Sequence, residues 1–111
     1  MSIGVDAPGT TQLLMGNEAI ARGALEAGVG FAAAYPGTPS SEILTELAKV
    51  AKKMHIHVEW SVNEKVAMEA AAGASFAGVR AMASMKQNGV NVISDFLVNL
   101  GMTDVGRSLV L

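Results

Sequence analysis

Segments with the period of a helix alternate along this chain with short apolar runs. The clearest run, Phe31–Tyr35, is apolar throughout and is typical of a strand buried on both faces. Further strands are indicated at 58–61, 80–85 and 108–111, and helices at 16–28, 39–54, 63–78 and 89–100. Strands that alternate with helices over short loops favour an α/β fold, in which a parallel sheet carries helices on both faces.

The composition suits one small domain with a tightly packed interior. Half of the 111 residues are apolar and 16% are charged, which is the opposite of a disordered chain. Only 5% are aromatic, whereas glycine occurs 12 times and alanine is the commonest residue. A core built from such residues relies on close approach of backbones. We assign residues 1–10, which lack any period, to a loose N-terminal lead-in and residues 11–111 to the domain.

Charge and residue usage exclude several classes of function. The net charge is −2 and lysine and arginine do not cluster, so we expect no nucleic acid partner. The absence of cysteine excludes disulfides, iron–sulfur clusters, thiolate zinc sites and a cysteine nucleophile within this chain. No uncharged run is long enough to cross a membrane and no signal peptide is visible, so we expect a soluble, cytoplasmic protein.

The chain ends at Ser108–Leu111, an apolar strand with no helix after it to cover the sheet edge. This ending suggests a truncated piece of a longer protein; the alternative is a small complete protein with a C-terminal strand. An unpaired apolar edge also favours self-association, so we expect a homo-oligomer.

Three polar loops are expected together at one edge of the sheet, because ligands in open parallel sheets bind beyond the carboxyl ends of the strands. These loops are Pro36–Ser40, Val62–Glu64 and Lys86–Gly89. Each is unusually polar for so apolar a chain, and each leads into a helix. Together they offer hydroxyl, carboxylate and amide groups on one rim.

Glu64 is the most informative residue of that rim. Helical turns counted from it reach Ala67 and Ala71, on the small-residue face, so its carboxylate is predicted to point inward. One interpretation is a capping box, because Ser61-Val62-Asn63-Glu64 fits the S-x-x-E pattern. The other is a general acid/base, or a hydrogen-bond acceptor for a ligand, at a dry helix N-terminus.

Thr38 and Ser40 also have two interpretations. They could cap the following helix, with Thr38 as its N-cap and Pro39 as its first residue. Alternatively, Gly37 lets the backbone approach a ligand whose carboxylate or phosphate the two hydroxyls bind.

Two further groups of charged or titratable residues are interpreted as solvent-exposed side chains. His55 and His57 could share a face, but without a third ligand nearby a solvent-facing pair is favoured over a metal site, and we assign no metal ligand. Lys65 and Glu69 are four residues apart and are interpreted as an exposed ion pair of small energetic value.

Specific strings in these segments resemble one family. They are Gly16-Asn17-Glu18-Ala19-Ile20-Ala21-Arg22-Gly23-Ala24, Tyr35-Pro36-Gly37-Thr38-Pro39-Ser40-Ser41-Glu42, Asn63-Glu64-Lys65-Val66-Ala67 and Ala71-Ala72-Gly73-Ala74. They are similar to the N-terminal region of the thiamine-diphosphate-dependent 2-oxoacid:ferredoxin oxidoreductases. The string Met85-Lys86-Gln87-Asn88-Gly89-Val90-Asn91-Val92 looks most like the indolepyruvate ferredoxin oxidoreductase alpha subunits, whereas pyruvate and 2-oxoglutarate relatives tend to carry a Thr-Ser-Gly type of loop there.

The resemblance implies that residues 11–111 are part of a pyrimidine-binding domain for thiamine diphosphate. In that family a glutamate holds the aminopyrimidine nitrogen of the cofactor, and Glu64 matches it as the catalytic residue. Thr38 matches a threonine placed near the carboxyl group of the substrate. Gly37, Gln87 and Asn88 lie in the matching loops and are further candidates for cofactor contact, although the departure of this third loop from the Thr-Ser-Gly pattern leaves individual roles there open.

The resemblance also implies groups that lie outside this chain. The diphosphate and its Mg²⁺ would be held by a separate diphosphate-binding domain, and iron–sulfur clusters by cysteines elsewhere. A beta subunit, ferredoxin and coenzyme A are the implied partners. The whole enzyme would oxidatively decarboxylate indolepyruvate and other aryl 2-oxoacids to the acyl-CoA, and the isolated chain would be inactive. The alternatives are the same region of a pyruvate or 2-oxoglutarate enzyme, or a non-catalytic interaction module of the same fold.

Overall fold

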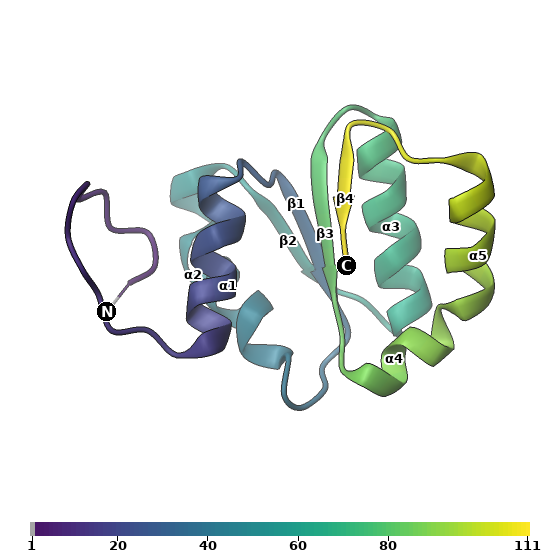
Figure 1. The fold of residues 1–111 in the computed structure, drawn as a ribbon, viewed down its shortest axis with the longest axis horizontal. Coiled ribbons are helices and arrows are strands. Elements are labelled where there is room, and N and C mark those ends of the chain that lie inside the picture. Colours follow the sequence, from purple (N-terminus) through teal and green to yellow (C-terminus); the bar gives the residue numbers. More distant parts are fainter. Residues whose placement is uncertain (1) are drawn as a thin grey trace.

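The computed structural model describes residues 2–111, and its helices and strands alternate along the chain as predicted. In chain order the elements are α1 (Gly16–Glu26), β1 (Phe31–Ala34), α2 (Ser41–Met54), β2 (His57–Trp60), α3 (Glu64–Phe76), β3 (Arg80–Ser84), α4 (Gln87–Val92), α5 (Ser94–Thr103) and β4 (Ser108–Val110). All strand pairs are parallel, and the order across the sheet is β2-β1-β3-β4 (Figure 1). None of these helices is long and apolar enough to cross a membrane.

Helices cover both faces of the sheet, which confirms the predicted α/β fold. In Figure 1, α1 and α2 lie on one side of the strands and α3, α4 and α5 on the other. Side chains alternate between the two faces along each strand, so each strand contributes side chains to the cores under both helical layers. In β3, Met82 faces the layer of α1 and α2, whereas Ala81 and Ala83 face the layer of α3.

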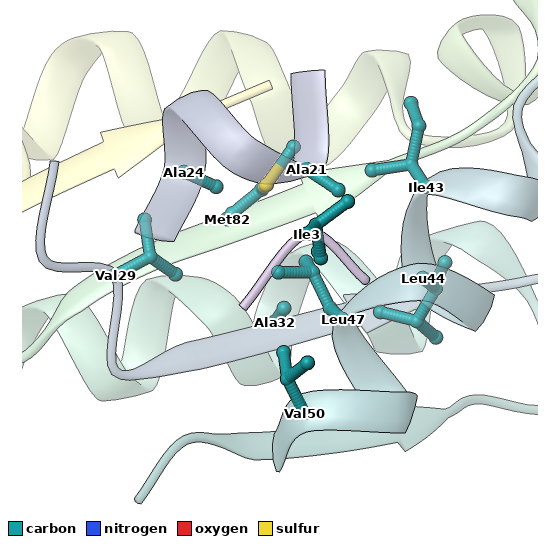
Figure 2. Packing of buried hydrophobic residues seen from close by; sticks show 11 residues of the cluster. Ile3, Ala21, Ala24, Val29, Ala32, Ile43, Leu44, Leu47, Val50 and Met82 are labelled. Carbon is teal, nitrogen blue, oxygen red and sulfur yellow. The ribbon is translucent and has the colours of Figure 1, made fainter. Parts of the chain in front are cut away.

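The core between the sheet and α1–α2 combines alanines with larger aliphatic side chains. Ala21 of α1 and Ala32 of β1 are almost completely buried, and Leu47 and Val50 of α2 pack in the same cluster (Figure 2). Because the alanines of α1 are small, α1 packs closely against α2, and α2 in turn lies on β1. The larger side chains of α2 fill the remaining space.

The core on the other face is built around the small residues of α3. Ala67 and Ala71 are fully buried, as the predicted stripe requires, and α3 lies directly over β1 and β3. Ala70 and Ala74, which were expected on the same stripe, are only half-buried. The buried stripe of α3 therefore contains fewer alanines than predicted, and its first buried residue is Glu64.

The strand order reverses between β1 and β3. The chain passes from β1 outward to β2 on one side and from β3 outward to β4 on the other. The connections that begin in the loops after β1 and β3 therefore run to opposite sides of the sheet, and such a switch point is where open parallel sheets bind their ligands. These loops lie at the lower edge of the sheet in Figure 1, together with the start of α3.

The predicted helix over residues 89–100 is two helices, α4 and α5, which meet at Ile93. Ile93 is fully buried in the core beside α3, and the hydroxyl of Ser94 donates to the Asn91 carbonyl at 2.9 Å. The change of direction lets Ile93 and Leu100 both reach the same core. A straight helix was expected because the apolar pattern alone carries no sign of this turn.

The chain before α1 has no helix or strand between residues 2 and 15, yet part of the N-terminal lead-in is packed against the domain. Ile3 is 1% exposed and belongs to the core of α1 and α2. The Arg22 guanidinium holds this segment by donating to the carbonyls of Ile3 at 2.9 Å and Val5 at 2.6 Å. Around these residues the lead-in is therefore anchored rather than loose.

Candidate functional site

The three polar loops predicted on one rim come together at the carboxyl edge of the sheet, and two glycines make the close contacts. A Cβ atom built on Gly89 of α4 would lie 2.7 Å from Cγ of Glu64 and 2.9 Å from Cβ of Met85. A Cβ built on Gly37 would lie 2.9 Å from Cδ of Lys86. The start of α3 thus contacts α4, and the loop after β1 contacts the loop after β3, because neither glycine has a side chain.

Glu64 is the first residue of α3 and is only 6% exposed. Its inward direction confirms the orientation predicted from the helical spacing. Within residues 2–111 its carboxylate makes no hydrogen bond and no ion pair. Its oxygens are not among the fully buried polar atoms, so the carboxylate is open to a ligand.

The capping-box interpretation of Glu64 is wrong. The N-cap of α3 is Asn63, whose Oδ1 accepts from the Val66 amide at 2.9 Å. In a capping box Glu64 would accept from the Ser61 amide, but that amide donates to the Ala34 carbonyl at 2.8 Å and continues the pairing of β1 with β2. Glu64 therefore has no capping role of this kind.

Lys65, next to Glu64, is paired with another element. Its Nζ lies 3.0 Å from Oδ1 of Asp95 in α5, and the side-chain hydrogen bond from Lys65 is the main cause that lowers the pKa of Asp95. The predicted pair with Glu69 does not form. Lys65 thus links α3 to α5 and leaves the charge of Glu64 unpaired.

The loop after β1 uses most of its polar groups internally. The Gly37 amide donates to the Ser41 hydroxyl at 2.8 Å, and the Gly37 carbonyl accepts from the Ser40 hydroxyl at 2.9 Å. The Gly37 backbone is therefore engaged within the loop, and its open side is filled by Lys86. This geometry gives no support to the prediction that Gly37 offers its backbone to a ligand.

Thr38 is exposed on this loop, and its hydroxyl makes no hydrogen bond within residues 2–111. The predicted N-cap role of Thr38 is wrong, because α2 begins at Ser41 and Ser40 occupies the N-cap position. Pro39 accordingly lies before the helix, joined to Thr38 by a cis peptide bond. The Thr38 hydroxyl is free to contact a ligand.

The third loop places two amides and one cation on the rim. Gln87 and Asn88 are the first two residues of α4 and are exposed. Lys86 is half-buried at the N-cap position, and its side chain lies along Gly37. Sequence reasoning did not select Lys86 as a site residue, because no pattern shows that its side chain crosses to a different loop.

An apolar pocket of about 460 Å³ lies beside the rim rather than over Glu64. Its lining includes Ile20 of α1, Ser40, Met85 and Val90. At the opposite end of the strands, where β1 and β2 begin, His57 stacks on Phe31 with ring centroids 5.2 Å apart. In the part of the chain that the structure describes, no three His, Asp or Glu side chains lie close enough to hold a metal ion.

Comparisons with known proteins agree with this geometry. The family model described as pyruvate flavodoxin/ferredoxin oxidoreductase, thiamine diphosphate-binding, matches residues 22–110. The indolepyruvate oxidoreductase subunit IorA of Pyrococcus horikoshii is 51% identical over 105 residues, covering 95% of this chain and 16% of that protein. IorA of Archaeoglobus fulgidus is 53% identical over 110 residues, covering 96% of this chain and 18% of that protein.

More distant relatives act on another 2-oxoacid. The 2-oxoglutarate synthase subunit KorA of Archaeoglobus fulgidus is 36% identical over 96 residues, which cover 84% of this chain and 27% of that protein. A solved structure of 2-oxoglutarate:ferredoxin oxidoreductase from Magnetococcus marinus, with 2-oxoglutarate, coenzyme A and succinyl-CoA bound, superimposes with a TM-score of 0.82 at 28% identity. That match covers 87% of this chain and 17% of that chain. The chain thus spans about a sixth of the length of its IorA relatives.

Proposed function

Because the chain belongs to the pyruvate flavodoxin/ferredoxin oxidoreductase family of thiamine-diphosphate-binding domains, we propose that it is the pyrimidine-binding part of an indolepyruvate oxidoreductase. The complete enzyme would oxidise an aryl 2-oxoacid with coenzyme A, releasing carbon dioxide and acyl-CoA and passing two electrons to ferredoxin. Identity of 51–53% to two IorA proteins, against 36% to a KorA protein, supports this substrate over 2-oxoglutarate.

The observation that carries the proposal is the unpaired carboxylate of Glu64, on a residue that is only 6% exposed. An aminopyrimidine ring offers a nitrogen that can share a proton with such a carboxylate, so the rim fits the cofactor. When bound, thiamine diphosphate supplies the nucleophilic carbon and the electron sink for decarboxylation. Gly89 leaves the space in which the Glu64 side chain lies, and the carboxylate oxygens stay open to a ligand at the rim.

Thr38 is proposed to donate a hydrogen bond from its hydroxyl to the carboxylate of the 2-oxoacid. Its exposure on the rim and the lack of an internal partner within residues 2–111 support this role. Gln87 and Asn88 are proposed to contact the cofactor from the start of α4, since their side chains are exposed on the same rim. A cofactor contact through the Gly37 backbone has no such support.

The remaining parts of the site are proposed to come from elsewhere. A diphosphate-binding domain would hold the diphosphate and Mg²⁺, and iron–sulfur clusters on other segments would accept the electrons. The relatives are named as subunits, which supports a beta subunit as partner. Ferredoxin, coenzyme A and a cytoplasmic location follow from the proposed reaction. Self-association of the chain is also proposed, because β2 and β4 are edge strands of the described sheet.

The test of this proposal is the substrate profile of the complete oxidoreductase that contains this chain. Reduction of a viologen dye is measured with indolepyruvate, pyruvate and 2-oxoglutarate, with and without thiamine diphosphate and coenzyme A. We expect cofactor-dependent turnover with the highest kcat/KM for indolepyruvate. A preference for pyruvate or 2-oxoglutarate would favour the alternative enzyme, and the absence of any 2-oxoacid turnover would favour a non-catalytic module.

A further inference from the structure

Lys86 is a charged residue of the rim that the proposed function does not yet use. It follows β3 directly, at the strand whose carboxyl end forms one side of the switch point. Its side chain crosses to the loop after β1, where a Cβ atom built on Gly37 would lie 2.9 Å from Cδ, 3.2 Å from Cγ and 3.3 Å from Cβ of Lys86. The aliphatic part of Lys86 therefore packs against Gly37, the residue next to Thr38 on the neighbouring loop.

The ammonium of Lys86 has no partner within residues 2–111, although the side chain is half-buried. Three of the other four lysines have partners, whereas Lys52 is exposed and has none within residues 2–111. Lys49 pairs with Glu46, and Lys65 with Asp95. Lys53 donates to the Gly4 carbonyl at 3.3 Å. Glu64 shares the rim with Lys86 but forms no ion pair with it. The stem is thus packed while the ammonium remains open to an anion that binds at the rim.

We propose that Lys86 binds the carboxylate of the 2-oxoacid substrate, together with the hydroxyl of Thr38. This inference rests on the proposed function. A carboxylate is the group that all 2-oxoacids share, and an ammonium with three donors binds it by a charge-assisted hydrogen bond. Contact with Gly37 limits the directions open to the stem and so orients the ammonium before the substrate binds. Lys86 is accordingly a substrate-binding residue, and Gly37 is the residue that positions it.

The first test replaces Lys86 in the complete oxidoreductase. In Lys86→Met the stem that contacts Gly37 is kept and the charge is lost, and in Lys86→Arg the charge is kept. Lys52→Met on the exposed end of α2 is the matched control, since Lys52 has no ion pair within residues 2–111. For Lys86→Met we expect kcat/KM for the 2-oxoacid to fall about ten- to hundredfold, mainly through KM. Lys86→Arg should recover most of this loss, and Lys52→Met should behave as wild type.

A second measurement separates the substrate carboxylate from the diphosphate of the cofactor, which an ammonium could also bind. The dissociation constant of thiamine diphosphate and exchange of its C2 proton without substrate should be unchanged in Lys86→Met. Inhibition by a carboxylate analogue and by its methyl ester is also compared. Wild-type enzyme should prefer the carboxylate, and Lys86→Met should lose that preference.

A third variant tests the contact with Gly37. The φ angle of Gly37 is not in the left-handed region, so its backbone can accept alanine without strain. The added methyl group would instead overlap the Lys86 stem. We expect this variant to weaken 2-oxoacid use in the same direction as Lys86→Met, with thermal melting measured alongside. If Gly37→Ala lowers the melting temperature but leaves KM unchanged, the positioning role of Gly37 is excluded.

The remaining outcomes decide the inference and the proposed function separately. If wild-type enzyme turns over 2-oxoacids and Lys86→Met has the same KM, the inference is wrong and the proposed function stands. If Lys86→Met weakens thiamine diphosphate binding instead, the ammonium serves the cofactor and the inference is again wrong. If wild-type enzyme turns over no 2-oxoacid, both are overturned.

Discussion

At the scale of single residues, the rim depends on glycines that leave space for functional side chains. Gly89 lies inside α4, where glycine is normally a weak point of a helix, yet it is buried against Glu64 and Met85. Gly37 has the same relation to Lys86. The sequence could indicate both glycines but not which side chains would fill the space beside them, because those contacts join different loops.

Gly89→Ala tests the contact that places Glu64. The added methyl group would overlap Glu64 and Met85, so we expect this variant to lower the free energy of unfolding by about 1–3 kcal/mol. Gly73→Ala is the matched control in α3: its Cβ would have no neighbour within 4 Å, and alanine should raise stability by up to about 1 kcal/mol. Urea unfolding of both variants is the measurement, and equal stability of the two would contradict the packing described.

Thr38→Val tests the proposed substrate contact. Removing one charge-assisted hydrogen bond costs about 1.5–3 kcal/mol, so kcat/KM for the 2-oxoacid in the complete oxidoreductase should fall at least about tenfold. Thermal stability should not change, because Ser40 rather than Thr38 occupies the N-cap position. Thr45→Val, on an exposed position of α2, is the control. Equal weakening of 2-oxoacid use and thiamine diphosphate binding would argue against this role for Thr38.

At the scale of elements, periodicity predicts which segments are helices and strands, whereas contacts between elements decide where they begin and turn. The S-x-x-E pattern favours a capping box, but the Ser61 amide is already used by the neighbouring strand. The apolar pattern after Lys86 favours one straight helix, but burial of Ile93 divides it into α4 and α5. Both errors arise because a local pattern contains no information on the partner across the sheet.

Asn63→Ala and Ser61→Ala distinguish the observed cap from the capping box. Asn63 accepts a hydrogen bond from the Val66 amide, so its replacement should lower the free energy of unfolding by about 1 kcal/mol. The Ser61 hydroxyl is buried without a partner within residues 2–111, so Ser61→Ala should be neutral or stabilising. Urea unfolding measures both, and a larger loss in Ser61→Ala than in Asn63→Ala would restore the capping box.

At the scale of the whole molecule, the alternation of elements and the apolar runs were sufficient to predict a parallel sheet covered on both faces. The strand order was not predicted, because order depends on which side of the sheet each crossover takes. Glu64 could be selected from its place at the start of a small-residue helix. Lys86 could not be selected, because its contact with Gly37 arises only when the loops after β1 and β3 meet at the switch point.

The isolated chain should have no oxidoreductase activity. It covers about a sixth of the length of its IorA relatives and contains no cysteine for a cluster. Pure chain supplied with thiamine diphosphate, Mg²⁺, coenzyme A and indolepyruvate should not reduce a viologen dye. Robust turnover in this assay, with contaminating enzyme excluded, would contradict the proposal that the chain supplies only part of the site.

The central claim is that Glu64 exchanges a proton with bound thiamine diphosphate, and exchange of the cofactor C2 proton in the complete oxidoreductase tests it most directly. Glu64→Gln is compared with Glu69→Gln, an exposed position on the same helix. Loss of a general acid/base contact should slow exchange by about 10²–10⁴-fold in Glu64→Gln, with little change in melting temperature, while Glu69→Gln exchanges at the wild-type rate. Wild-type exchange in Glu64→Gln would contradict the claim.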